Sequence, residues 1–430
     1  MNLVSDLDLP AFDYAAPDFS ADRFHAQLAG IRQHGWLARS PLAYIVLDHD
    51  AGEFFLRSRK TEFPGRQIAG FFGVTSGPLA EHIDANILNL GGEHHRRLRA
   101  LVGPALTPRA ADRWRPVMRT CLEQLWERVA GRRRCDFVAA VAQPYPALMI
   151  AAVLGAPAED AWRLQAWSAW VQRQFDIRAL EVSRDDIERA VTELQDYVTG
   201  LLEARQAAPG DDLISALLAA RDQGDRLSAA ECVQLVVNLV AGGIDTTAGQ
   251  LAHAIRIFAG HPGQWARLAA DPGLAPRAVD EVLRFEPVTP FTARICLEQV
   301  EFRGVIFPAG TIVAVCAERA NRDAGDGHDG DGHDGDGERF DITAARPGRL
   351  LTFGAGTHYC LGANLARAEL EEALAFLAPR APGLALDGPP QLGGVEGIYG
   401  IDKLPVTWPG SNHDSSNHDS SNHGRAPDVS

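Results

Sequence analysis

The sequence is poor in cysteine, and the cysteines it has follow no regular spacing. Six occur in 430 residues, at Cys121, Cys135, Cys232, Cys296, Cys316 and Cys360, and no two form a Cys-x-x-Cys pair. A disulfide framework or a cysteine-based metal cluster needs closely and regularly spaced thiols. The spacing therefore indicates a reducing compartment, in which most of these thiols are buried and inert.

Net positive charge and membrane-directed segments are absent as well. The chain carries a formal net charge of −15, which argues against nucleic acid as a partner. Its N-terminus has no basic start and no long apolar run, so we expect neither a signal peptide nor a membrane anchor. Because 46% of the residues are hydrophobic, we expect a large core in a soluble, cytoplasmic protein.

Helical periodicity dominates the chain. Apolar residues recur at three- and four-residue steps in residues 21–34, 93–102, 109–130, 158–176, 183–206, 211–222, 228–259, 262–270, 275–285 and 363–378. Runs typical of β-strands are fewer, at residues 43–48, 300–315 and 404–408. The sequence therefore predicts a mainly α (α+β) fold, with a large helical region and a small β-sheet region.

Two segments are of low complexity. Residues 325–337 repeat the unit GDGHD, and residues 411–424 repeat the unit SNHDS. Aspartate and histidine can ligate cations, so a weak metal site is one interpretation. Neither segment has EF-hand spacing or an apolar anchor, which favours solvated, disordered chain instead. We predict a single domain over residues 1–410 and a disordered tail over residues 411–430.

Cys360 stands in an unusual setting, the glycine-rich stretch FGAGTHYCLG that precedes a helical pattern. It could be a buried structural thiol, a nucleophile activated by His358, or an axial thiolate ligand of haem iron. A histidine two residues away in a tight loop rarely reaches the sulfur productively. A helix N-terminus, in contrast, supplies free N–H groups that favour the thiolate. Gly354, Gly356 and Gly362 would let the backbone turn tightly beside a flat macrocycle.

A second unusual stretch, AGGIDTT, interrupts the long apolar pattern of residues 228–259. Glycine costs about 1 kcal/mol relative to alanine inside a helix. Close packing against a neighbouring helix is one explanation, but it leaves the acid beside a hydroxyl unexplained. Gly242 and Gly243 would instead leave room above a haem, and Thr246 could bond to a preceding carbonyl and bend the helix next to Asp245.

Together these motifs resemble the cytochrome P-450 superfamily. FGAGTHYCLG is similar to its haem-thiolate signature at every specified position, and the motifs follow the family's order. The resemblance implies that Cys360 binds the iron of haem b, that Phe353 shields its sulfur, and that His358 reaches a propionate. It also implies that Asp245 and Thr246 deliver protons during O2 activation.

Further charged residues match positions of the family. Glu281 and Arg284, three residues apart on one helix face, would form its structural ion pair, with Arg339 as the third member. Two buried propionates need cations, and the candidates besides His358 are His95, Arg99 and Arg294.

The resemblance also implies a substrate pocket. Matching the family's regions gives an apolar and aromatic set that comprises Ile68, Phe71, Phe72, Trp167, Trp170, Phe175, Val240, Val288, Phe291 and Ile398. A hydrophobic small molecule is therefore expected, such as a terpenoid, steroid, polyketide, fatty acid or aromatic compound, which the enzyme would hydroxylate or epoxidise.

Electrons would come from outside this sequence, because it has no flavin-binding segment, dinucleotide fingerprint or iron–sulfur cysteine cluster. A ferredoxin or flavodoxin and an NAD(P)H-dependent reductase are the implied partners. An acidic carrier could dock on a basic set that comprises Arg109, Arg113, Arg115, Arg119, Arg132, Arg133 and Arg134. A peroxide-driven haem oxygenase and a non-catalytic haem-binding recruitment protein are the alternatives.

Overall fold

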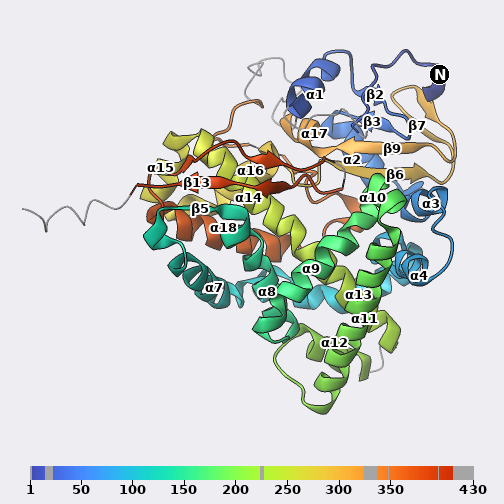
Figure 1. The fold of residues 1–430 in the computed structure, drawn as a ribbon. Coiled ribbons are helices and arrows are strands. Elements are labelled where there is room, and N and C mark those ends of the chain that lie inside the picture. Colours follow the sequence, from blue (N-terminus) through green and yellow to red (C-terminus); the bar gives the residue numbers. More distant parts are fainter. Residues whose placement is uncertain are drawn as a thin grey trace, which may run out of the picture.

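The computed structural model describes residues 2–14, 23–222, 227–323, 337–346, 348–395 and 397–409 (Figure 1). Nearly all of the GDGHD repeat and the whole tail after residue 410 lie outside the described residues. The predictions for these two segments, including the disordered tail, therefore stay predictions.

Long helices make up most of the molecule, as the sequence predicts. They are α5 (Gly92–Val102), α7 (Arg115–Glu127), α8 (Pro144–Leu154), α9 (Ala161–Gln172), α11 (Arg184–Ala207), α12 (Leu213–Asp222), α13 (Ala229–Gly243), α14 (Asp245–Gly260), α15 (Pro262–Ala270), α16 (Ala275–Phe285) and α18 (Ala363–Arg380). Shorter helices are α1 (Phe24–Arg32), α2 (His49–Arg57), α3 (Gly65–Phe71), α4 (Pro78–Ala85), α6 (Pro108–Asp112), α10 (Ile177–Val182) and α17 (Ala317–Asp323).

The strands form several small sheets. The largest has the order β2 (Leu37–Arg39), β3 (Tyr44–Val46), β9 (Ile312–Cys316), β6 (Phe291–Cys296) and β4 (Thr61–Glu62). Within it β3 and β9 are parallel, and the other neighbours are antiparallel. Figure 1 shows this sheet beside α1, α2 and α17, away from the long helices.

Three smaller sheets complete the β structure of the described residues. One joins β1 (Asn2–Leu3), β8 (Val305–Phe307) and β7 (Val300–Phe302), and another joins β10 (Ala385–Leu386), β13 (Pro405–Thr407) and β5 (Arg134–Asp136). The last is the hairpin of β11 (Gln391–Leu392) and β12 (Ile401–Lys403). The mainly α prediction is confirmed, but short strands such as β2 and β5 carry too few residues to show a period of two.

The central helix of the molecule is the run α13–α14. By length and composition Ala229–Gly260 could cross a membrane, with a mean hydropathy of 1.2. In the fold it is a core element instead, because Val236, Leu251 and Phe258 are completely buried. Its start is fixed by a capping box, in which Ser228 and Glu231 each bond the other's backbone N–H. Burial among other helices therefore accounts for its apolar composition.

The predicted pair Glu281–Arg284 is present and buried on α16. Arg284 Nε lies 2.7 Å from Glu281 Oε2, and both side chains are 4% exposed. The prediction that Arg339 is the third member is wrong at the level of side chains. Only the backbone carbonyl of Arg339 accepts a hydrogen bond from Arg284, so its own side chain points outward and is 71% exposed. Arg346 takes the place, with Nε 3.2 Å from Glu281 Oε2.

This arrangement predicts different effects for the two arginines. Arg346→Ala should lower the free energy of unfolding by about 1–3 kcal/mol, because a buried carboxylate loses a charged donor. Arg339→Ala keeps its backbone carbonyl and should stay within about 0.5 kcal/mol of the wild type. Urea unfolding of both variants tests the assignment, and equal losses would contradict it.

Helix α1 is tied to the core through a histidine between two buried acids. His25 Nε2 lies 3.0 Å from Glu286 and Nδ1 lies 2.9 Å from Glu318, whose side chains are 2% and 0% exposed. Burial alone would lower the pKa of His25, but the two carboxylates outweigh it and raise the pKa to about 9. His25 is therefore protonated in the folded protein at neutral pH.

This histidine predicts a pH-dependent stability. Because the folded pKa of about 9 exceeds the ordinary 6.5, its contribution is complete below pH 6.5 and is lost as the pH rises through 9. His25→Gln should cost about 1–2 kcal/mol at low pH, solvent screening included, and less above pH 9. Unfolding is followed in urea, with the exposed His34→Gln as control. A loss independent of pH would contradict the protonated bridge.

Candidate functional site

The Cys360 loop is held in one conformation by its backbone. Gly354 and Gly356 have φ of 69° and 70°, a region that favours glycine. A Cβ atom on Gly356 would lie 2.9 Å from the carbonyl oxygen of Leu56 at the end of α2. The Cys360 N–H donates to the Phe353 carbonyl at 2.9 Å and closes the loop. Gly356 is therefore needed for the approach of α2, a reason the sequence did not reveal.

Cys360 differs from the other cysteines. It is exposed, whereas Cys135 is half-buried and Cys121, Cys232, Cys296 and Cys316 are buried. The protein around the thiol raises its pKa by desolvation, while the N–H groups of Gly362 and Ala363 and the guanidinium of Arg99 act in the opposite direction. The residue is thus exposed, although protein atoms around the thiol desolvate it. Donors at a helix start and an accessible sulfur suit a thiolate that binds a metal ion.

The other interpretations of these cysteines can now be weighed. Burial raises the pKa of Cys121, Cys135 and Cys296 to about 11, as expected for inert thiols. No hydrogen bond joins His358 to Cys360 among the described residues. The imidazole of His358 instead lies against that of His95, with ring centroids 4.3 Å apart. The geometry does not support a cysteine–histidine catalytic pair.

Next to this loop lies a cluster of cationic and imidazole side chains that has no acid in it. The members, here called the anion cluster, are His95 and Arg99 of α5, Arg294 of β6, and His358 of the 3-10 turn Gly356–His358. His95 and Arg294 are 1% and 3% exposed. Burial is the main cause that lowers the pKa of His358 to about 3, and the charges of His95, Arg294 and Arg99 lower it further. The four groups are therefore close enough to interact electrostatically.

The hydrogen bonding of the anion cluster is incomplete. Both ring nitrogens of His95 and Nδ1 of His358 are buried without a partner. Arg294 donates to the Ala293 carbonyl at 2.8 Å, and Arg99 donates to the Tyr359 carbonyl at 2.7 Å. Within the described part of the chain, no carboxylate pairs with any of them. Unpartnered buried donors are costly, so the cluster fits a ligand that carries carboxylate groups, as haem does.

The central helix breaks where the sequence places an acid beside an alcohol. Helix α13 ends at Gly243 and α14 begins at Asp245. Thr246 Oγ1 donates to the Gly242 carbonyl at 2.5 Å, and Ser168 Oγ of α9 donates to Asp245 Oδ2 at 2.6 Å. Burial raises the pKa of Asp245 to about 6, although the bond from Ser168 lowers it. Asp245 can therefore hold or release a proton near neutral pH.

The two glycines before this break serve different purposes. A Cβ on Gly242 would have nothing within 4 Å, in keeping with the space expected there. A Cβ on Gly243 would lie 2.8 Å from Ile150 of α8. Gly243 therefore allows close packing of two helices, and the prediction that Gly242 leaves room for haem stays a prediction.

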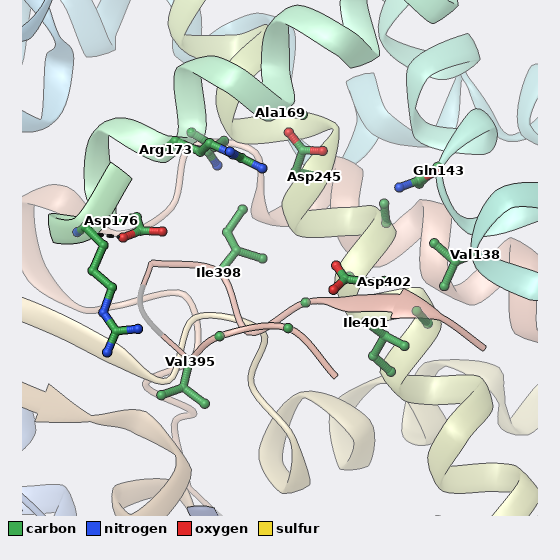
Figure 2. A pocket seen from close by; sticks show the side chains of 18 of the residues that line it. Val138, Gln143, Ala169, Arg173, Asp176, Asp245, Val395, Ile398, Ile401 and Asp402 are labelled. Atoms are coloured by element: carbon green, nitrogen blue, oxygen red, sulfur yellow. Dashed lines mark hydrogen bonds between the residues drawn. The ribbon is translucent and has the colours of Figure 1, made fainter. Parts of the chain in front are cut away.

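A cavity of about 450 Å³ borders the Asp245 side of α14. Figure 2 shows Asp245, Arg173, Gln143, Asp402 and Ile398 around it. Its lining mixes these polar groups with apolar side chains and backbone. None of the anion cluster lines it, and neither does Cys360 or Thr246. This cavity is thus separate from the side of the helix that carries Thr246.

Of the side chains predicted to line the substrate pocket, Ile398 alone borders this cavity. Several others have packing roles that periodicity cannot reveal. Val240 and Val288 are buried in the apolar core, and Trp167 donates to Glu193 at 2.8 Å. Phe291 stacks on Tyr14, with centroids 4.3 Å apart.

The remaining members of that predicted set lie on α3, directly after it, on α9, and in the 3-10 turn Arg173–Phe175 that follows α9. Phe71 is 75% exposed and packs edge-on against Phe72. Ile68 is half-buried, and the guanidinium of Arg173 lies 4.5 Å from the Trp170 ring centroid. Phe175 contacts Phe63, with centroids 5.9 Å apart. Sequence analysis missed Ser168, because a serine within a helical pattern gives no signal of its own.

Comparisons with known proteins agree with this geometry. The family model described as cytochrome P-450 matches residues 274–377. Luteothin monooxygenase of Streptomyces thioluteus is 37% identical over 409 residues, which cover 93% of this chain and 96% of that protein. The chain belongs to the cytochrome P-450 family.

Two further comparisons extend this P-450 assignment. Mycinamicin IV hydroxylase/epoxidase of Micromonospora griseorubida is 35% identical over 334 residues, which cover 76% of this P-450 and 81% of that protein. The crystal structure of CalO2 superposes with a TM-score of 0.83 at 30% identity, covering 93% and 99% of the two chains. The predicted family, fold and enzyme class are confirmed: this P-450 is an oxygen-incorporating oxidoreductase that uses haem, O2, a small-molecule substrate and a redox partner.

The anion cluster of this P-450 predicts a defect in haem retention. Arg294→Leu removes one buried cation, so haem should be lost roughly tenfold faster, the effect of about 1.4 kcal/mol. Transfer of haem to apomyoglobin measures the rate. Arg96→Ala, which changes an exposed arginine on α5, the helix that carries His95 and Arg99, is the control and should behave as the wild type. Unchanged haem loss in Arg294→Leu would contradict a propionate site at the cluster.

Proposed function

We propose that this P-450 is a monooxygenase in which Cys360 is the axial ligand of haem b and Asp245 and Thr246 supply protons. One atom of O2 enters a small hydrophobic substrate, by hydroxylation or epoxidation. The observation that carries the proposal is the accessible thiol of Cys360 beside buried donors that lack an acid. Bound haem supplies the O2 chemistry, and thiolate donation favours cleavage of the O–O bond.

The residues around the haem site then have separate tasks. Cys360 takes the iron, while His95, Arg99, Arg294 and His358 bind the propionates and fix the orientation of the ring. Phe353 shields the sulfur: its ring lies 6.2 Å from the ring of Tyr359, next to the Cys360 loop. Its other neighbour is Arg367, whose guanidinium lies 5.3 Å from the Phe353 ring centroid.

Asp245 and Thr246 form the proton-delivery pair. The hydroxyl of Thr246 is held at the helix break by its bond to the Gly242 carbonyl. Asp245, with a pKa of about 6, is protonated in part of the molecules near neutral pH and can pass a proton on. The alternative of a non-catalytic haem protein gains no support from a site that keeps both groups.

The substrate belongs to the bacterial natural products in this proposal. Two of the relatives are named for luteothin and mycinamicin IV. A polyketide, terpenoid, steroid, fatty acid or aromatic compound fits the expectation of an apolar molecule.

Electrons are supplied by a ferredoxin or flavodoxin with its NAD(P)H-dependent reductase. The basic set predicted as their dock is largely neutralised in the fold: Arg113 pairs with Asp211, Arg119 with Glu372, and Arg134 with Asp387. Arg115 joins Asp112, Glu371 and Glu372. Within the described residues, Arg109 and Arg132 are exposed and carry no ion pair, so these two are the better candidates for an acidic carrier.

In this proposal the protein is cytoplasmic, with one haem domain over residues 1–410 and a tail over residues 411–430. Support comes from the small number and irregular spacing of the cysteines and from the burial of the apolar run α13–α14 in the core. Turnover with NAD(P)H, a surrogate ferredoxin and its reductase should exceed turnover with hydrogen peroxide alone. The reverse result would favour a peroxide-driven oxygenase.

The proton-delivery pair makes a prediction that needs no known substrate. Reduced enzyme can convert O2 to hydrogen peroxide with one NADPH and one proton, or to two water molecules with two of each. Thr246→Ala should raise the peroxide fraction several-fold, because loss of general acid catalysis costs on the order of a hundredfold in the proton step. Peroxide released per O2 consumed is the measurement.

The control for this prediction is Thr199→Ala. Thr199 makes the same kind of bond on α11, to the Gln195 carbonyl at 2.8 Å, on the surface. It should leave the peroxide fraction unchanged. An equal effect of both variants, or none for Thr246→Ala, would remove Thr246 from the proposal.

A further inference from the structure

The Asp245 face of α14 is built differently from its Thr246 face. Asp245, Ala248, Gly249 and Ala252 follow steps of three and four, so they share one face, and all of them border the cavity of about 450 Å³. Thr246 lies one residue on, about 100° around the helix, and bonds back to Gly242. Figure 2 shows Asp245 at the polar cavity, and the side of α14 that carries the Thr246 hydroxyl does not border that cavity.

The position of Asp245 depends on a single side chain from another helix. Ser168 of α9 is fully buried, and its Oγ lies 2.6 Å from Asp245 Oδ2. The same oxygen lies 3.3 Å from the carbonyl oxygens of Val240 and Ala241. Because a hydroxyl has one proton, the shortest contact takes it, and Ser168 donates to the carboxylate. No other donor bonds this carboxylate in the part of the chain the structure describes.

We propose that Ser168 is a positioning residue for proton delivery: its hydroxyl holds the Asp245 carboxyl between the cavity and Thr246. The inference rests on the proposed function of the Asp245–Thr246 pair. In each transfer the O–H bond of the Asp245 carboxyl breaks, its proton passes to Thr246 Oγ1, and the hydroxyl proton of Thr246 would go on to the O2 being reduced. The carboxylate then regains a proton from solvent in the cavity, while Ser168 donates throughout.

The position of α9 therefore affects proton delivery by Asp245 and Thr246. α9 carries Ser168 and continues through a 3-10 turn, Arg173–Phe175, into α10. The other charged groups that border the cavity are Arg173, Asp176, Arg178 and Asp402, and they set the local potential together with solvent. Ser168 differs from them because it touches the carboxyl directly.

The test compares Ser168→Ala with Ser168→Cys, Ser168→Thr and a matched control in the holoenzyme. The control, Ser215→Ala, removes another buried hydroxyl, which lies on α12, far from Asp245. The Ser215 hydroxyl accepts a hydrogen bond from the Gly210 N–H at 2.8 Å. Cysteine has a similar volume but is a weak donor, so it keeps the test valid if the alanine variant does not fold. Threonine keeps the hydroxyl and should restore wild-type behaviour.

Two readouts separate positioning from a merely structural role. The first is the infrared pH titration of the Asp245 carboxyl, assigned by its loss in Asp245→Asn. Since the bond from Ser168 favours the carboxylate, Ser168→Ala and Ser168→Cys should move the titration to higher pH. The second is the peroxide fraction of substrate-free NADPH oxidation with a surrogate ferredoxin and reductase, which should rise several-fold. Ser215→Ala should leave both unchanged.

The Asp245→Asn background decides whether Ser168 acts through Asp245. There, Ser168→Ala should add nothing to the peroxide fraction. A full additional effect in this background, or a wild-type titration and peroxide fraction in Ser168→Ala and Ser168→Cys, overturns the inference. If Asp245→Asn itself leaves the peroxide fraction unchanged, the proposed role of Asp245 fails. If the peroxide fraction changes in Asp245→Asn but not in the Ser168 variants, the proposed role of the Asp245–Thr246 pair is supported and the inference about Ser168 is wrong.

Discussion

The site depends on one electrostatic constraint: buried donors gathered with no acid to satisfy them. His95, Arg99, Arg294 and His358 come from one helix, one strand and one loop, and within the described residues none pairs with a carboxylate. Such a cluster is costly unless an anion completes it. A ligand that carries carboxylate groups would supply that anion. Binding of its carboxylates at the cluster would also orient the rest of the ligand toward the thiol of Cys360. Arg99 connects the anion cluster to the Cys360 loop, because its guanidinium donates a hydrogen bond to the carbonyl of Tyr359, the residue before the cysteine.

The break between α13 and α14 adds the second element of function. The acid there is buried enough to hold a proton near neutral pH, and the alcohol beside it is bonded back into the preceding turn. One side of the helix therefore meets solvent in a polar cavity and the other meets the space left by Gly242. The hydrogen bond from Ser168 to Asp245 connects α9 to this break, so the position of α9 affects the position of the proton-donating carboxyl.

The sequence predicted those parts that short, fixed motifs encode. The loop around Cys360 and the Asp245–Thr246 pair can be found without a structure because their residue types are rare at that spacing. Contacts between distant segments were out of reach. Arg346 rather than Arg339 meets Glu281 because the backbone at Arg339 turns its side chain outward, and Gly243 serves packing against Ile150. The aromatic pocket set also failed to gather at the cavity, since helix phase alone cannot tell core from lining.

The central claim is that Cys360 is the axial ligand of the iron. The most direct measurement is the absorption spectrum of the ferrous carbon monoxide complex, for the wild type and for Cys360→Ser. The account predicts the strongly red-shifted Soret band of thiolate ligation in the wild type. It also predicts loss of that band in the variant, which should still bind haem through the anion cluster. A red-shifted band that persists in Cys360→Ser, or its absence from freshly prepared wild-type protein, would contradict the assignment.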